Sequence, residues 1–335
     1  MEQRPLGKTG LSVSALGFGC GAVGGLMVRG DHIEQTAAVA SALDAGITYF
    51  DTAPSYGDGR SEENLGRVMR ELGTWRDVVV GTKVRLRPSD LDHPAPAIAR
   101  SLETSLRRLG RDAVDLFQLH NPIAESSEAA ASVQGSGQAV ALDAVCGPIV
   151  DGMRLLVSRG LTRHIGITGL GQTRAVHATA VSGKFDTAQT YFNALNPSGA
   201  HSGAAGGEQD FAALIGAAAS AGLGVIAIRV MAAGALSAQQ GRHTNAGDPG
   251  PQLAAGAEYG RDLERAAAIR GLAADLGYDG PLELALRFAL ATPGISTVLV
   301  GYSDRTHLED ALRWTARGPA PADVVNRVVA VARAS

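Results

Sequence analysis

The strongest constraint on the fold is a regular alternation of short apolar segments with longer helix-like segments through most of the 335 residues. The apolar segments stay mostly uncharged until their C-terminal ends, which is typical of parallel strands buried on both faces. A strand–helix unit repeated eight times predicts an α/β fold of the (β/α)8 TIM-barrel type. The predicted strands are 15–19, 47–51, 78–83, 114–120, 163–168, 186–191, 224–229 and 296–300.

The predicted helices start and stop at recognisable signals. Asp31 is expected to cap a helix that ends near Ala45, with Gly46 as its stop. Ser61 is expected to cap the next helix, whose first turn carries two Glu residues that suit the positive end of the helix dipole. The predicted helices are 31–45, 61–72, 95–109, 147–160, 171–182, 207–222, 261–277 and 304–316, with an extra one at 281–291.

Three further segments complete the predicted architecture. Arg4 to Val13 reads as a β-hairpin around Gly7-Lys8-Thr9-Gly10, placed to plug the N-terminal end of the barrel. Residues 124–145, expected to be a loop or partly disordered, and 231–260 are loop insertions after strand ends, on the face where barrel enzymes place their sites. They are lids, substrate walls or tolerated low-complexity insertions. We predict a single domain over 1–335.

Composition excludes several classes of function. A net charge of −3 and a pI near 6.2 argue against a nucleic-acid or polybasic membrane surface. Two cysteines, Cys20 and Cys146, form no disulfide framework or zinc pattern. The first residues are polar and no apolar run has the roughly 20 residues of a membrane helix. We therefore expect a soluble, cytoplasmic protein, and the oligomeric state stays open.

Four chemically matched residues follow three successive strands. Asp51 ends one predicted strand, Tyr56 lies in the loop just beyond it, and Lys83 and His120 end the next two strands. The C-terminal ends of parallel strands meet at one end of a barrel, so these side chains are expected to converge. A buried carboxylate is costly unless it is paired, and Lys83 is the natural partner of Asp51.

These residues suit proton transfer to a carbonyl oxygen. A Tyr has a reference pKa of about 10, and a nearby ammonium lowers the pKa of a phenol. We assign Tyr56 as acid/base, Lys83 as the tuning ammonium, Asp51 as its orienter, and His120 as carbonyl positioner or proton relay. The alternatives are a structural ion pair, a rim aromatic, a core histidine, or metal binding by Asp51 and His120. No metal site is predicted, because Lys83 competes with a cation.

The arrangement resembles the aldo-keto reductase superfamily, whose catalytic Asp, Tyr, Lys and His match these four positions. The resemblance extends from the Gly7–Gly10 turn to Gly301. It implies a (β/α)8 barrel and NAD(P)-dependent hydride transfer between a nicotinamide and an aldehyde, ketone, alcohol or sugar. The matching segments are Phe50-Asp51-Thr52-Ala53, Tyr56-Gly57, Gly66, Thr82-Lys83, Leu119-His120-Asn121-Pro122 and Ile165-Gly166-Ile167.

The resemblance also implies cofactor contacts, since no side chain supplies a hydride. The expected cofactor is NADP(H), with NAD(H) possible, and Asp51 borders the nicotinamide. Arg305 at the start of the last helix suggests NADP(H), since a guanidinium and a helix N-terminus suit a phosphate. The remaining expected contacts are Gly19, Cys20, Gly21, Thr168, Gln189, Ile228, Arg229, Val230, Met231, Gly234, Leu236, Ser303 and His307.

Departures from the family pattern concern the expected cofactor contacts and the NADP preference, not the four catalytic positions. Gly169 stands where the family commonly has an Asn, Ile228 where it has a stacking Tyr, and Ala311 where it often has an Asn. The segment Gly166-Ile167-Thr168-Gly169-Leu170 is similar to the sequence found in the family branch that includes L-galactose and D-threo-aldose dehydrogenases. Three hypotheses follow: a carbonyl reductase or sugar dehydrogenase, a cofactor-binding redox-sensing subunit with little turnover, or an unrelated metal-dependent barrel hydrolase.

Overall fold

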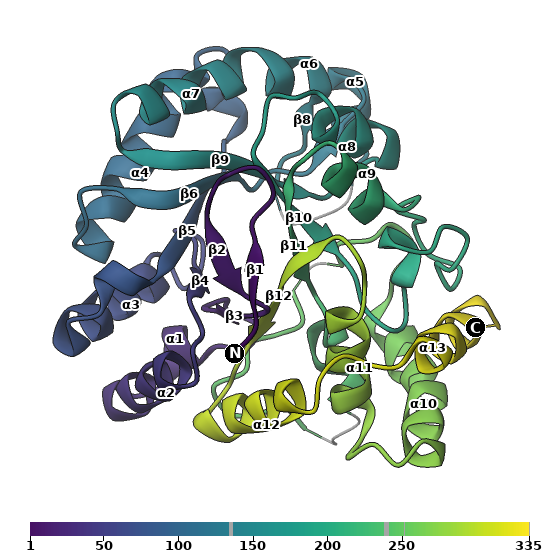
Figure 1. The fold of residues 1–335 in the computed structure, drawn as a ribbon. Coiled ribbons are helices and arrows are strands. Elements are labelled where there is room, and N and C mark those ends of the chain that lie inside the picture. Colours follow the sequence, from purple (N-terminus) through teal and green to yellow (C-terminus); the bar gives the residue numbers. More distant parts are fainter. Residues whose placement is uncertain (134–136, 238–240, 251, 335) are drawn as a thin grey trace.

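The computed structural model describes residues 1–133, 137–237, 241–250 and 252–334. Its centre is a closed barrel of parallel strands that follow one another around the circle in chain order (Figure 1). This confirms the predicted (β/α)8 barrel. The strands are β3 (Leu16–Gly19), β4 (Tyr49–Asp51), β5 (Val79–Val84), β6 (Val114–Leu119), β9 (Thr162–Gly169), β10 (Thr187–Tyr191), β11 (Gly224–Ile228) and β12 (Ile295–Gly301).

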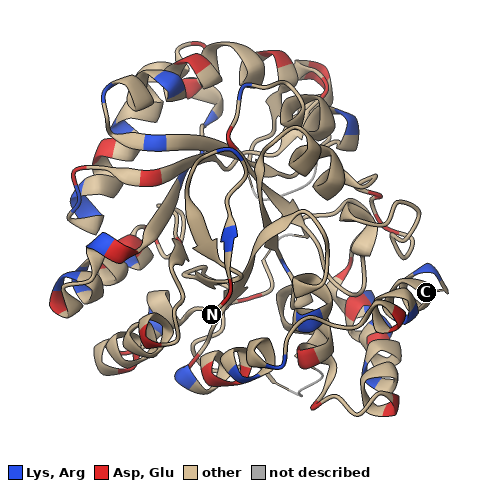
Figure 2. Ribbon diagram, in the orientation of Figure 1, with Lys and Arg blue, Asp and Glu red and all other residues tan. Residues whose placement is uncertain are grey.

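Helices cover the outside of the barrel, and in Figure 2 the charged residues of both signs lie mainly on these outer helices. The helices of the ring begin and end within a few residues of the predicted positions, with one exception below. They are α2 (His32–Asp44), α3 (Arg60–Leu72), α4 (Pro94–Leu109), α7 (Val150–Ser158), α8 (Thr173–Ala180), α9 (Leu214–Ser220), α10 (Tyr259–Asp275), α11 (Pro281–Leu290) and α12 (Arg305–Ala316).

The exception is α9, which is much shorter than the predicted helix 207–222. The Asp210 carboxylate accepts hydrogen bonds from the backbone N–H groups of Gly203 and Ala212, which holds this segment in a turn. Ala212 and Ala213 then adopt left-handed φ angles of 49° and 57° before the helix starts. A further helix, α13 (Ala322–Ala334), follows the ring and was not predicted.

The two predicted helix caps have different outcomes. Asp31 caps α2 as predicted, because its carboxylate accepts a 2.8 Å hydrogen bond from the backbone N–H of Glu34. The predicted cap at Ser61 is wrong, because α3 starts one residue earlier after Gly59, whose φ is 93°. Ser61 is buried instead, and its hydroxyl donates to the backbone carbonyl of Cys20 at 2.9 Å.

The N-terminal hairpin plugs the barrel as predicted. It consists of β1 (Gln3–Pro5) and β2 (Ser12–Ser14), and it lies across the end of the barrel that faces the viewer in Figure 1. Gly7 has a φ of +57°, and a Cβ there would overlap the backbone of Gly224 in β11. The apolar cluster inside this end of the barrel contains Leu6, Leu11, Val13, Tyr49, Val79, Leu116 and Ile226.

The two insertions differ in regularity. Residues 124–145, expected to be a loop or partly disordered, contain a parallel strand pair and short helices, while 134–136 lie outside the described residues. In the insertion 231–260, residues 238–240 and 251 lie outside the described residues, and the described part is largely irregular between the 3₁₀ segment and α10. The remaining elements are α1 (Leu26–Arg29), η1 (Trp75–Asp77), η2 (Pro88–Asp90), β7 (Ile123–Ala124), α5 (Ser127–Ala130), β8 (Val140–Ala141), α6 (Leu142–Ala144), η3 (Val145–Ile149), η4 (Pro197–Gly199) and η5 (Ala232–Ser237).

Candidate active site

A buried ion pair forms the floor of the site. The Lys83 ammonium on β5 contacts the Asp51 carboxylate at the end of β4, and both side chains are almost fully buried. Lys83 also donates to the backbone carbonyl of Thr52 at 2.9 Å. Burial alone disfavours the charged lysine, but Asp51 and Tyr56 outweigh it and raise the pKa of Lys83 above its ordinary value. Lys83 therefore stays an ammonium ion.

The second oxygen of Asp51 is held by three neutral donors from inside the barrel. The Tyr49 hydroxyl donates at 3.0 Å, the Gln118 amide at 3.1 Å and the Gln189 amide at 2.8 Å. These side chains come from β4, β6 and β10, so the strands around the barrel converge on one carboxylate. Several hydrogen bonds to one oxygen hold the carboxylate in a single orientation.

Tyr56 lies above this pair, in the loop after β4. Its hydroxyl accepts a 3.1 Å hydrogen bond from the Lys83 ammonium, and its side chain is only partly buried. The ammonium also lies 4.8 Å from the centre of the phenol ring. Tyr56 thus joins the buried ion pair to the C-terminal face of the barrel, where a substrate can reach its hydroxyl.

His120 lies beside Tyr56, with the two rings edge to face and their centres 5.9 Å apart. Burial, followed by the charges of Lys83 and Arg85, holds the pKa of the His120 imidazole well below its ordinary value of 6.5. His120 is therefore a neutral imidazole. The structure brings together all four residues singled out from the sequence, Asp51, Tyr56, Lys83 and His120.

The expected nicotinamide contacts at the end of β3 and in the loop after it lie next to Asp51 and Tyr56. Gly21 faces the Tyr56 ring, since a Cβ there would come within 3.9 Å of it, and Cys20 is buried with its backbone N–H bonded to the Asp51 carbonyl. Gly19 pairs with Asp51 in the sheet. Cys20 is not an ionisable site, because burial raises the pKa of its thiol far above the ordinary value.

Two polar residues on neighbouring strands have distinct environments. Thr168 and Gln189 pair across β9 and β10, and both are buried. Gln189 already donates to Asp51, whereas the Thr168 hydroxyl has no hydrogen-bond partner within the described part of the chain. At Gly169, a Cβ would lie 2.8 Å from the Gln189 carbonyl oxygen, so the Asn common in the family does not fit here without a backbone shift.

The segment after β11 leaves the barrel by a sharp turn. Arg229 has a left-handed φ of 62°, and its guanidinium donates to the Pro249 carbonyl at 2.8 Å, which ties the strand end to the long insertion. The Gly234 φ is 96°. Ile228 and Met231 are partly exposed, and Val230 and Leu236 are buried in the core.

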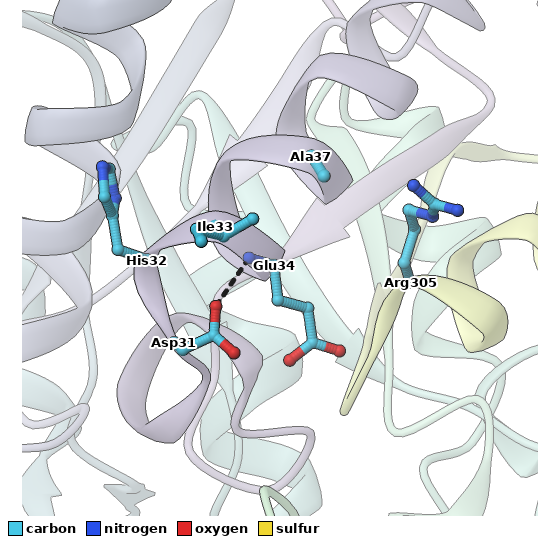
Figure 3. Close-up of a pocket in the computed structure, with 6 residues that line it drawn as sticks. All are labelled: Asp31, His32, Ile33, Glu34, Ala37 and Arg305. Carbon is cyan, nitrogen blue, oxygen red and sulfur yellow. Dashed lines mark hydrogen bonds between the residues drawn. The ribbon is translucent and has the colours of Figure 1, made fainter.

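The residues expected near the adenosine phosphate lie at the start of α12. Arg305 is exposed and pairs with Glu309 at 2.9 Å, while the Asp304 carboxylate caps the helix by accepting from the backbone N–H of His307. Arg305 also lines a shallow pocket of about 730 Å³ with Asp31, His32, Ile33, Glu34 and Ala37 (Figure 3). The Ser303 side chain is buried, and its carbonyl accepts a 3.0 Å hydrogen bond from Asn245 of the long insertion.

Sequence reasoning missed Tyr49, Gln118 and Arg85. Each lies two residues from a predicted site residue on the same strand or just beyond it: Tyr49 before Asp51, Gln118 before His120, and Arg85 after Lys83. Side chains two apart on a strand point to the same face, so this period was the signal that could have found them. Among the described residues, no group of three His, Cys, Asp or Glu side chains is arranged to hold a metal.

The comparison that decides the family spans nearly the whole chain. The model of the Aldo/keto reductase family matches residues 15–333. The chain belongs to the aldo/keto reductase family. It is accordingly an enzyme of the NAD(P)-dependent oxidoreductase class, as the sequence predicted. Among the described residues, none of the helices is both long and apolar enough to cross a membrane.

Individual relatives agree with this assignment. The chain is 29% identical to L-galactose dehydrogenase from Arabidopsis thaliana over 92% of this chain and 86% of that protein. It is 37% identical to D-threo-aldose 1-dehydrogenase from a Pseudomonas species, over 34% of this chain and 41% of that protein. The solved structure of aldo-keto reductase AKR11C1 from Bacillus halodurans superimposes with a TM-score of 0.74 at 22% identity, covering 100% and 97% of the two chains, and shows the shared fold.

Proposed function

We propose that this protein transfers hydride between a nicotinamide dinucleotide and the carbonyl group of an aldehyde, ketone or sugar, with Tyr56 as general acid and base. The observation that carries the proposal is the hydrogen-bonded series from Asp51 through Lys83 to the Tyr56 hydroxyl. This series ends at a half-buried hydroxyl beside a neutral His120, on the face of the barrel where substrates bind.

Each residue of the series has one task during reduction. Tyr56 gives its hydroxyl proton to the oxygen that gains negative charge, and the Lys83 ammonium stabilises the phenolate left behind. Asp51 keeps Lys83 in place and charged. Neutral His120 donates a hydrogen bond to the same substrate oxygen. In the oxidative direction, the Tyr56 phenolate takes the proton from the alcohol.

The residues present fit a nicotinamide cofactor, which supplies or accepts the hydride when bound. The support is the buried Thr168 hydroxyl, which lacks a hydrogen-bond partner in the described part of the chain. A buried hydroxyl gains from a partner, and the carboxamide of a nicotinamide can provide one. Gly21 offers backbone beside the Tyr56 ring without a side chain, and Gly19 and Cys20 lie against Asp51. On the family resemblance, we also propose that the segment from Ile228 to Leu236 borders the pyrophosphate.

The carboxylates near α12 favour NAD(H) over the NADP(H) that Arg305 alone suggested. Arg305 is already paired with Glu309, and Asp304 occupies the helix N-terminus that a 2′-phosphate would need. Glu34 lines the same pocket as Arg305 (Figure 3). A phosphate would meet these negative charges, whereas a ribose hydroxyl can donate to a carboxylate. We therefore propose a preference for NAD(H).

A sugar substrate oxidised at its hydroxyl-bearing carbon is the second candidate. The similarity to L-galactose dehydrogenase and D-threo-aldose 1-dehydrogenase favours it. A redox-sensing role with little turnover remains the third. The walls that choose between substrates come from the loops after the strands, in particular the two insertions.

The test is a cofactor titration followed by a substrate panel. NADH and NADPH are titrated separately by fluorescence, and turnover is measured with aldehydes, ketones and aldoses in both directions. We expect tighter binding of NADH and measurable turnover with at least one class. Binding of neither cofactor contradicts the function. Tighter binding of NADPH contradicts only the proposed preference, and binding without turnover favours the sensing role.

A further inference from the structure

The guanidinium of Arg85 contacts His120, the proposed carbonyl-positioning histidine. Arg85 follows β5 and lies two residues after Lys83, so it emerges on the same side of the chain as the catalytic lysine. Its Nη2 atom lies 3.5 Å from Nδ1 of His120 in a hydrogen bond. The Tyr56 phenol also acts on Arg85 electrostatically. Arg85 is therefore part of the site, although no proton-transfer role is assigned to it.

The chemistry of this contact fixes where the imidazole carries its proton. A guanidinium has only N–H donors and no acceptor, so Nδ1 of His120 has to be the acceptor and carries no hydrogen. A neutral imidazole with a bare Nδ1 holds its single proton on Nε2. Positive charges at Arg85 and Lys83 also oppose a second proton, in agreement with the lowered pKa of His120.

The 124–145 insertion and the segment after β5 hold Arg85 in place. The Asn121 side chain accepts from the backbone N–H of Leu86 at 2.8 Å and donates to the Leu86 carbonyl at 2.9 Å. The same amide donates to the Gln138 carbonyl at 2.8 Å, which docks the insertion on this segment. Gly137 then lies over Arg85, since a Cβ at Gly137 would come 2.9 Å from the Arg85 Cδ.

We propose that Arg85 is a positioning residue that keeps the His120 proton on Nε2, the nitrogen that donates to the substrate oxygen, and that residues 137 and 138 of the insertion hold Arg85 there. This inference rests on the proposed role of His120. The 124–145 insertion thereby contributes to the site, because Gly137 and Gln138 lie next to the segment that carries Arg85. Arg85 acts through His120 and needs no contact with the substrate.

The test reads the His120 tautomer directly by nitrogen NMR on protein labelled with ¹⁵N-histidine. The His120 signals are assigned by their loss in His120→Asn. We expect one tautomer in the wild type, with the proton on Nε2. In Arg85→Met the other tautomer becomes populated, and in Arg85→Glu, where a carboxylate faces Nδ1, the proton moves predominantly to Nδ1. Arg85→Lys, which keeps a donor-only cation, retains the wild-type state.

Arg87→Met is the matched control, because Arg87 lies two residues further on and is exposed. It is expected to leave the spectrum unchanged. Gly137→Ala, which crowds Arg85, is expected to weaken the bias. A wild-type proton on Nδ1, or an unchanged tautomer in folded Arg85→Met and Arg85→Glu, overturns the proposal. The spectra need no substrate or turnover, so failure of the proposed function is seen separately, in the substrate panel.

Discussion

At the scale of single residues, the site is built around one carboxylate. Asp51 accepts hydrogen bonds from Lys83 and from Tyr49, Gln118 and Gln189, so a single acidic group connects four strands. Its charge keeps Lys83 an ammonium in spite of full burial. The same ammonium touches the Tyr56 hydroxyl. In the proposed function, this sharing of one ammonium between an acid and a phenol makes Lys83 a catalytic and not only a structural lysine.

Replacement of Lys83 by Met tests this distinction. Loss of the ammonium disfavours the phenolate form of Tyr56, so the alkaline limb of the pH–rate profile is expected to move to higher pH. Asp51 loses its charged partner, and removal of one partner of a buried pair costs about 3–5 kcal/mol of stability. The profile is measured on protein shown to be folded and cofactor-bound. An unmoved alkaline limb with a near-normal rate makes Lys83 structural.

At the scale of secondary-structure elements, the sequence predicts the strand ends better than the helix starts. Asp51, Lys83 and His120 were located because a polar residue ends each apolar run, and the barrel brings such ends together. The prediction that Ser61 caps α3 was wrong because a serine hydroxyl has other available partners, here the Cys20 carbonyl. The turn at 207–213 depends on the Asp210 side chain, which sequence pattern does not reveal.

The packing of α3 against α4 depends on a residue without a side chain. A Cβ at Gly66 would lie 2.6 Å from the backbone carbonyl oxygens of Arg108 and Leu109, so the two helices are in backbone contact there. Gly66→Ala is expected to destabilise the protein by roughly 1–3 kcal/mol through overpacking. Thermal or urea unfolding measures the effect.

The matched control is Gly271→Ala in α10, where an added Cβ would meet no atom within 4 Å. There the better helix propensity of alanine is expected to stabilise the protein by roughly 0.5–1 kcal/mol. Equal effects of the two substitutions would show that α3 and α4 are not in close backbone contact at Gly66.

At the scale of the whole molecule, the barrel has one closed end and one functional end. The hairpin fills the N-terminal end with apolar side chains, and the long loops gather at the other end with the polar network. The sequence predicts this difference between the two ends because the catalytic candidates lie at the C-terminal ends of strands or just after them. The internal structure of the 124–145 insertion could not be predicted, since it depends on contacts such as Asn121 with Gln138.

An acidic pair links the loop after β10 to helix α10 and is expected to make stability depend on pH. Arg265 contacts Glu208 at 2.6 Å and Asp262 at 3.6 Å. Burial and the neighbouring Glu208 raise the pKa of Asp262 from 3.8 to about 7. The folded protein thus holds a proton that the unfolded chain releases, so this group lowers stability as the pH rises from about 4 to 7.

Asp262→Asn removes that dependence. The variant is expected to gain stability relative to the wild type on going from pH 5 to pH 8, because it mimics the protonated carboxyl at both pH values. Melting temperatures of both proteins at the two pH values measure this, with the neighbouring exposed Glu264→Gln as control. A difference between variant and wild type that is the same at pH 5 and pH 8 contradicts the raised pKa.

The central claim is that the Tyr56 hydroxyl carries the proton, and Tyr56→Phe tests it most directly. The substitution keeps the ring against His120 and leaves the Asp51–Lys83 pair intact. Turnover with the best substrate of the panel and the affinity for the reduced cofactor are measured together. We expect kcat to fall by about 10²–10⁴-fold, the usual contribution of a general acid, with cofactor affinity unchanged. A kcat within about tenfold of the wild type, a barrier change of only about 1.4 kcal/mol, would contradict the account.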